Sequence, residues 1–314
     1  MEHFWIVLAV LGALLQAIRT AAQRDLNAHL STMATTYVRS LFGLPLLAIY
    51  LAAVMASTGE GMPEFGWRYL AFTFVGAMAQ VIATALLIHM FTLRSFGVGT
   101  MLTKVDVVIT AILGALFFSE TLSAGGIAAL AVVMAGVVSM SLERTGKVSA
   151  VASLPTQSGR RGRIASIVAD RSLMVALGCA FSFAISFLTY REAALVIGEG
   201  SFLWRGGWTV LLAILMQTVV VGVWLAWREP GLLARVKPHA RLCAFIGATS
   251  AVGSICWFTA FALQNASYVR AVGQIEVVFT LLVSALYYRE RISTLEYAGI
   301  AMTLAGVLMF RLMA

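Results

Sequence analysis

The stretch from Val107 to Ser141, VVITAILGALFFSETLSAGGIAALAVVMAGVVSMS, returns from Val277 to Arg311 as VVFTLLVSALYYRERISTLEYAGIAMTLAGVLMFR. The two copies share 12 identities in 35 positions without a gap. Within the copies, the offset of 170 residues aligns Glu120 with Glu290 and Gly136 with Gly306. Just before the copies it aligns Lys104 with Gln274 and Asp106 with Glu276. Self-similarity at a fixed spacing indicates a duplicated structural unit. We therefore expect the chain to consist of two related halves.

The composition is that of a protein with several membrane spans. Of the 314 residues, 61% are hydrophobic and 11% are charged, whereas soluble domains carry about 45–50% apolar and 25% charged residues. These values exclude a soluble globular protein, and the mean hydropathy of +0.92 excludes a disordered chain. The three cysteines lie in apolar runs and form no C-x-x-C pair, so we interpret them as core hydrophobes. The net charge of +8 fits basic cytoplasmic loops, and no nucleic-acid partner is expected.

Ten mostly apolar segments have the length that a spanning helix needs, about 20 residues. They are residues 4–21, 32–56, 67–92, 96–118, 122–141, 173–191, 202–227, 241–263, 268–288 and 295–310. A basic loop at 142–171 separates a first five-helix repeat, residues 1–141, from a second, residues 172–314. Because five is odd, the second repeat enters the membrane in the opposite direction. The prediction is an all-α membrane protein with ten transmembrane helices in two inverted repeats, an architecture common in secondary transporters.

Lysines and arginines gather on one side of the predicted spans. The loops after the first, third, fifth, seventh and ninth segments carry 13 of them, whereas the opposite side carries essentially Arg68 and Arg311. Since basic loops stay in the cytoplasm, the loop 142–171 is predicted to be cytoplasmic and both termini to lie outside. The expected location is a bacterial cytoplasmic (inner) membrane.

Two motifs carry a resemblance to a known family. They are KVDVVIT at 104–110, followed by Glu120, and QIEVVFT at 274–280, followed by Glu290. This pairing resembles the signature of the drug/metabolite transporter superfamily, EamA type. The resemblance implies a ten-helix, inverted-repeat carrier of small metabolites. Relatives often have a proline just after the acidic position, where this chain has valine in both copies, so no proline is present to break these two helices.

Five charged residues lie well inside predicted spans: Arg39, Lys104, Asp106, Arg205 and Glu276. A charge in the hydrocarbon is costly and usually faces a cavity or a partner. On one reading, Asp106 and Glu276 meet near the axis relating the repeats and form a proton-coupling or cation-recognising pair. On the other, Asp106 pairs with Lys104 or Arg205, and Glu276 pairs with Arg39, only to neutralise buried charge.

Arg39 and Arg205 form a corresponding basic pair on the second and seventh spans, and the arginine fork suits carboxylate or phosphate groups. Together with the two acids they suggest a zwitterionic or anionic substrate, although a structural network of ion pairs is an equal alternative. Near span ends, tryptophans also serve as interfacial anchors, and Glu120 and Glu290 are expected to cap or brace the turns that follow them. The candidate substrate-binding residues are Tyr37, Arg39, Gln80, Lys104, Asp106, Tyr190, Trp204, Arg205, Trp208, Trp257, Gln274 and Glu276.

The predicted function is secondary transport of small polar metabolites, most simply amino-acid-like zwitterions or anions, by alternating access, with Asp106 and Glu276 as candidate proton carriers. A carrier of cationic drugs or lipid-like molecules is the alternative. An embedded enzyme is disfavoured because the sequence contains neither H-E-x-x-H nor G-x-S-x-G. No catalytic residue, metal or cofactor is expected. The expected partners are a small-molecule substrate and the lipid bilayer, and the protein is predicted to be a monomer or homodimer.

Overall fold

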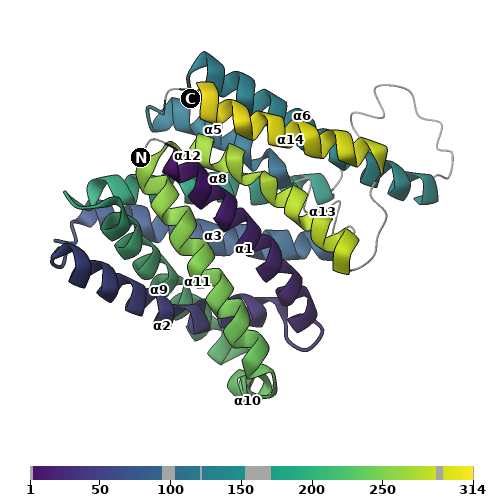
Figure 1. Ribbon diagram of the computed structural model, residues 1–314. Helices are drawn as coiled ribbons and strands as arrows, with labels where there is room; N and C mark the ends of the chain where they lie inside the picture. Colours follow the sequence, from purple (N-terminus) through teal and green to yellow (C-terminus); the bar gives the residue numbers. More distant parts are fainter. Residues whose placement is uncertain (1–2, 94–102, 121, 153–170, 288–292, 314) are drawn as a thin grey trace.

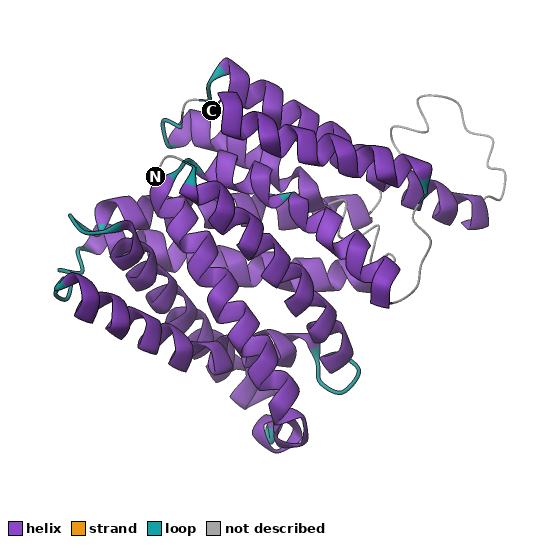
Figure 2. Cartoon of the chain, in the orientation of Figure 1, coloured by secondary structure: helices purple, strands orange, loops and turns teal. Residues whose placement is uncertain are grey.

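The computed structural model describes residues 3–93, 103–120, 122–152, 171–287 and 293–313. Within these residues every regular element is a helix (Figure 2). The α-helices are α1 (Phe4–Leu26), α2 (Thr32–Thr58), α3 (Trp67–Leu93), α5 (Asp106–Phe117), α6 (Ala124–Ala152), α8 (Arg171–Val196), α9 (Phe202–Arg228), α10 (Leu232–Val236), α11 (Ala240–Leu263), α12 (Ala266–Gly273), α13 (Ile275–Tyr287) and α14 (Thr294–Met313). Short 3₁₀ helices, η1 (Thr103–Val105) and η2 (Lys237–His239), precede α5 and α11.

Eight helical segments among the described residues are long and apolar enough to cross a membrane, and two shorter apolar helices, Asp106–Phe117 and Ala124–Met140, accompany them. Ten spans were predicted. Part of the fourth, residues 94–102, lies outside the described residues. The fifth does not end at Ser141 as expected, because α6 continues to Ala152 and takes in the first part of the predicted loop. The rest of that loop, 153–170, and Glu290 also lie outside the described residues.

Two helices begin at serine caps that are 170 residues apart. The hydroxyl of Ser31 accepts a hydrogen bond from the NH of Ala34 at the start of α2, and the hydroxyl of Ser201 accepts one from the NH of Trp204 at the start of α9. Such caps satisfy backbone donors that have no partner within the helix. The caps therefore fix α2 and α9 in corresponding registers.

The predicted ninth span is broken despite its lack of proline. α12 ends at Gly273 and α13 begins at Ile275, with Gln274 between them. Hydrogen bonds of the 3₁₀ type, between residues three apart, bridge the break. The NH of Gln274 donates to Ala271 O, and the NH of Val277 donates to Gln274 O. The corresponding η1 segment directly precedes α5. An interrupted helix is tolerated at membrane depth when it is buried in protein or lines a cavity, so the break marks Glu276 as a site of interest, and Asp106 holds the corresponding position at the start of α5.

Helices from the two halves pack against one another (Figure 1). The main pairs are α1 with α11, α3 with α8, α2 with α9, and α6 with α14. α6 and α14 cross closely at glycines, because a Cβ added at Gly136 would lie 2.5 Å from Thr303 Oγ1 and one added at Gly306 would lie 2.5 Å from a Val133 methyl carbon. Small residues allow such close helix approach in membranes.

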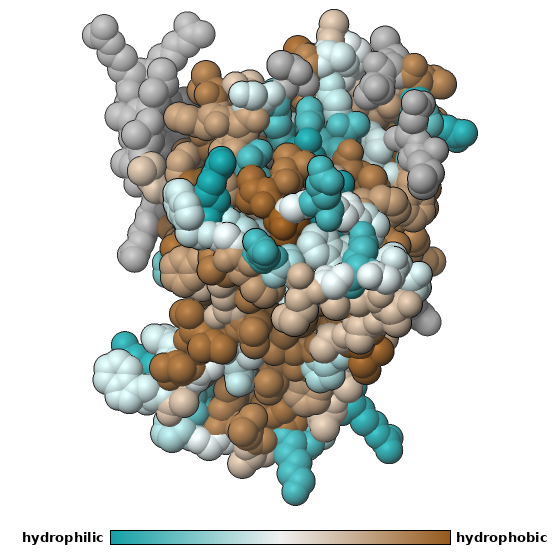
Figure 3. Space-filling view, turned by 90° about the vertical axis from the view of Figure 1, so that its left-hand side faces the viewer, coloured by the Kyte–Doolittle hydropathy of each residue, from teal (hydrophilic) through white to brown (hydrophobic). Residues whose placement is uncertain are grey.

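The two ends of the chain lie on the same side of the molecule (Figure 1). The α2–α3, α8–α9 and α11–α12 connections lie on this side as well, whereas the α1–α2 turn and α10 lie at the opposite end. Figure 3 looks onto the side with the termini, where hydrophilic side chains are interspersed with hydrophobic ones. We call this side the terminal side and the other the α10 side.

Candidate functional site

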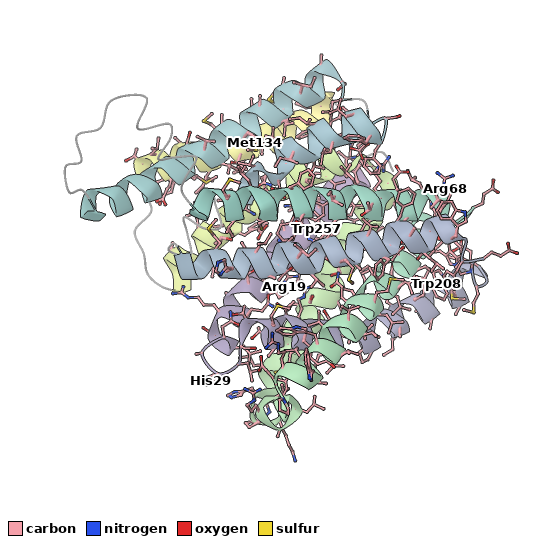
Figure 4. The ribbon with its side chains drawn as sticks, turned by 180° about the vertical axis from the view of Figure 1, so that it is seen from behind. Arg19, His29, Arg68, Met134, Trp208 and Trp257 are labelled. Carbon is pink, nitrogen blue, oxygen red and sulfur yellow. The ribbon has the colours of Figure 1, made fainter. Side chains whose placement is uncertain are left out.

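A cavity of about 400 Å³ lies between the two halves. Its inner part is lined by residues at the α12–α13 break and around the start of α5, including Lys104, Asp106 and Glu276, and its outer part by Asn27 and Thr32, which flank the α1–α2 turn. Figure 4 shows Arg19 and Trp257, both lining residues, inside the helix bundle, with His29 of the α1–α2 turn at one end. The cavity therefore extends from the broken helices toward the α10 side.

Two buried ion pairs cross between the halves at the inner end of the cavity. Lys104 Nζ lies 2.9 Å from Glu276 Oε2, and Arg270 Nη2 lies 2.6 Å from Asp106 Oδ2. Gln16 Nε2 donates a further bond of 2.9 Å to Glu276 Oε2. Each acid is thus paired with a base from the other half.

These pairings differ from those considered from the sequence, in which Asp106 met Lys104 or Arg205 and Glu276 met Arg39. These expected partners are wrong, since Lys104 and Asp106, two residues apart on a helix, do not face each other, and Arg39 and Arg205 form no ion pair with either acid among the described residues. Lys104 reaches Glu276 at the start of α13, and Asp106 reaches Arg270 in α12. A buried charge that crosses to a partner in this way couples the positions of the two halves.

Arg39 and Arg19 line the cavity and form no ion pair with an acidic residue of the described part of the chain. Arg39 is only 8% exposed, and among the described residues no carboxylate lies within 4.0 Å of Arg39 or Arg19. The Nε atoms of both are buried without a hydrogen-bond partner in the described part of the chain. A buried charge without a partner is costly, so these guanidinium groups are suited to receive an anionic group from a ligand.

The remaining wall of the cavity carries polar groups and aromatic rings. Gln80 and Tyr190 line it and are joined by a hydrogen bond of 3.0 Å from the Tyr190 hydroxyl to Gln80 Oε1. The Arg270 guanidinium lies 4.2 Å from the Phe187 ring centroid and 5.3 Å from that of Trp257. Because Arg270 is held between these rings and Asp106, we interpret it as part of the cavity framework.

Seven of the twelve candidate substrate-binding residues line the cavity: Arg39, Gln80, Lys104, Asp106, Tyr190, Trp257 and Glu276. Tyr37 and Gln274 do not. The Gln274 side chain is fully buried in the helix break, and neither of its polar atoms has a partner among the described residues.

Trp204, Arg205 and Trp208 lie at the terminal side rather than in the cavity. Trp204 Nε1 donates a 2.9 Å bond to Gly61 O, and Trp208 packs edge-on against Phe65 with 5.4 Å between ring centroids. Figure 4 shows Trp208 and Arg68 on the same side of the molecule, opposite His29. Since the serine caps align the helices at 170 residues, Arg205 corresponds to Thr35 and not to Arg39. Arg39 and Arg205 are 166 residues apart, four fewer than the two serine caps, so the prediction that they correspond is wrong.

Sequence reasoning missed several lining residues. Gln16, Arg19 and Arg270 are not among the candidate residues from the sequence, yet all three line the cavity. For Gln16 and Arg19 a signal was available, because both are polar residues in a largely apolar run. The sequence could not show how deep in the helix bundle these side chains lie, because that depth depends on where α1 begins and where the ninth span breaks.

The terminal side is closed by contacts between the halves. Glu120 accepts hydrogen bonds from the NH groups of Ala266 and Ser267 at the start of α12, and its carboxylate lies 3.1 Å from Arg191 Nε. Glu120 therefore caps a helix of the other half, whereas the sequence predicted that it braces its own turn.

A second contact on the terminal side joins Glu60, in the α2–α3 connection, to Ser201 at the start of α9. The Ser201 hydroxyl donates a 2.8 Å bond to Glu60 Oε2, and the Ser201 NH donates to Oε1. Burial alone would raise the pKa of Glu60, but the bonds from Ser201, with smaller contributions from Thr58 and Arg205, hold the pKa below its ordinary value. The carboxylate is thus kept charged and bound to the helix start.

Comparisons with known proteins agree with this architecture. The family model described as the EamA-like transporter family matches residues 3–142 and 170–312. A solved structure titled only "Crystal structure of protein" superposes with a TM-score of 0.67 and 14% sequence identity over 100% of this chain and 97% of its own. At that identity the similarity shows the fold alone. No curated protein matches the sequence.

Proposed function

Since this chain belongs to the EamA-like transporter family and is an integral membrane protein, we propose that it carries small organic anions, including amino-acid-like zwitterions, as a secondary transporter. One observation carries the proposal: Arg39 and Arg19 line a cavity between the halves and have no acidic partner among the described residues. Arginine binds carboxylate and phosphate groups through a planar fork of donors. Five basic residues line the cavity against two acidic ones, Asp106 and Glu276, which disfavours a cationic substrate.

The proposed mechanism is alternating access by ten helices in two inverted five-helix repeats, residues 1–141 and 172–314. The packing of α1 on α11 and of α3 on α8 supports this arrangement, because each pair joins the first helix of one half to the third long helix of the other. The cavity reaches the α10 side, whose loops are basic. By the positive-inside rule we assign the α10 side to the cytoplasm, in a bacterial inner membrane.

Asp106 and Glu276 are the proposed proton carriers. Their ion pairs cross between the halves, so a movement of one half relative to the other breaks both pairs. A buried carboxylate that loses its partner takes up a proton more readily. Proton uptake at these two residues would then accompany the conformational change.

The proposal is tested by measuring thermal stabilisation of the purified protein with three probes of matched length: succinate, 4-aminobutyrate and 1,4-diaminobutane. A ligand that binds only the folded state stabilises by about 2.7 kcal/mol at a hundredfold excess over Kd. We expect succinate to stabilise most, 4-aminobutyrate less and diaminobutane least. Stabilisation by diaminobutane above that by succinate would contradict the proposal and favour a carrier of cations.

A further inference from the structure

A residue outside the cavity is hydrogen-bonded to two residues of its wall. Gln217 lies in the middle of α9, is 2% exposed and does not line the cavity. Its amide Nε2 donates 2.6 Å to Gln80 Oε1 and 3.0 Å to the Tyr190 hydroxyl. Both of these partners line the cavity. A polar side chain buried in a membrane helix requires such partners, and Gln217 has found them on α3 and α8.

In the structure the Gln80 amide turns its oxygen toward Tyr190 and Gln217. Its Oε1 accepts from both the Tyr190 hydroxyl and Gln217 Nε2, which uses the two lone pairs of a carbonyl oxygen. Gln80 Nε2 makes no hydrogen bond to the described residues and is not among their buried atoms without a partner. The amide NH₂ is therefore the polar group that Gln80 offers to the cavity.

An NH₂ group on this wall has a consequence for selectivity. It adds a donor to a cavity that already contains the arginines Arg19 and Arg39 and the Trp257 indole NH, which has no partner among the described residues. Carboxylate and phosphate oxygens accept from such donors, whereas an ammonium group, which can only donate, would leave them without a partner. A reversed Gln80 amide would present its carbonyl oxygen and accept an ammonium group.

We propose that Gln217 is a positioning residue that, with Tyr190, turns the Gln80 amide so that only its NH₂ faces the substrate, and so makes this wall select anionic groups over ammonium groups. The inference rests on the proposed function, because it names what distinguishes anions from zwitterions in the same cavity. It predicts that Gln217 affects the preference among substrates without touching any of them.

The test compares the Kd of succinate with that of 4-aminobutyrate in wild type, Gln217→Leu, Gln80→Leu and the double variant. Loss of the Gln217 bond is expected to reduce the preference for succinate roughly three- to tenfold, the size of one hydrogen bond. In the Gln80→Leu background the same substitution is expected to leave the ratio unchanged, because Gln217 acts through Gln80. An equal change of ratio in both backgrounds would overturn the inference.

The matched control is Thr218→Val. Thr218 is the neighbouring buried polar residue on α9, and its hydroxyl donates only to Ile214 O of its own helix. This variant is expected to retain the wild-type ratio of affinities. If Gln217→Leu does not fold, Gln217→Asn serves in its place, because it withdraws the amide by one methylene and keeps its polarity.

The two proposals fail in different ways. If the wild-type protein shows no preference for succinate over diaminobutane, the proposed function is wrong and the Gln217 inference falls with it. If it prefers both succinate and 4-aminobutyrate to diaminobutane but does not distinguish these two, only the Gln217 inference is wrong. If wild type prefers succinate and Gln217→Leu retains the full preference, or weakens both probes by one common factor, only the Gln217 inference is wrong.

Discussion

Arg39→Ala is expected to weaken succinate binding by at least about thirtyfold. Removing one partner of a buried, hydrogen-bonded charge pair costs about 2–5 kcal/mol, and every 1.4 kcal/mol is a factor of ten in Kd. The stability of the ligand-free protein is expected to be unchanged or improved. Arg39 has no ion pair among the described residues, and its positive charge repels that of Arg19. Affinity and stability are both measured by recording the melting temperature of the variant without succinate and at increasing succinate concentrations.

Arg205→Ala is the matched control for Arg39. It removes the same group from a corresponding long helix, but Arg205 lies toward the terminal side and does not line the cavity. Succinate affinity in this variant is expected to remain within about twofold of wild type, a change of under 1 kcal/mol. Equal losses in the two variants would show that the cavity is not where the anion binds.

The second large effect concerns the ion pair between Lys104 and Glu276. Lys104→Met leaves the Glu276 carboxylate buried, with Gln16 as its remaining side-chain hydrogen-bond donor among the described residues. Breaking a buried pair in this way is expected to cost about 3–5 kcal/mol of stability. Lys104→Met/Glu276→Met removes both charges and is expected to recover most of the loss, since a pair replaced by apolar residues is often neutral. The stability of both variants is measured by thermal or denaturant unfolding in detergent.

The double variant also separates structure from transport. If the ion pair only neutralises charge, the double variant is stable and still exchanges substrate. If Glu276 carries protons, the double variant is stable but its transport no longer responds to a pH gradient. A Lys104→Met variant as stable as wild type would contradict the assignment of this pair altogether.

The sequence predicted the helical membrane architecture well, because apolar segments about 20 residues long can be recognised without knowledge of their partners. The repeat placed Asp106 opposite Glu276, and both lie at one end of the same cavity. The partners of these acids could not be predicted, because they come from the other half through Lys104 and Arg270. Which residues meet across a bundle depends on packing rather than on local pattern.

Two other features show the same limit. Gln217 reads as one polar residue in an apolar helix, and only the packing of three helices reveals its bonds to Gln80 and Tyr190. The helix break at Gln274 contains no proline, the residue that usually indicates a break in a sequence. It is formed by backbone bonds and burial, which carry no simple sequence signature.

The central claim, that the cavity carries organic anions across the membrane, is tested most directly by counterflow in proteoliposomes. Vesicles containing the protein are loaded with unlabelled succinate and placed in labelled succinate. The account predicts accumulation of label with wild type and with Arg205→Ala, and none with Arg39→Ala. Exchange of 1,4-diaminobutane but not of succinate, or accumulation by Arg39→Ala as fast as by wild type, would contradict it.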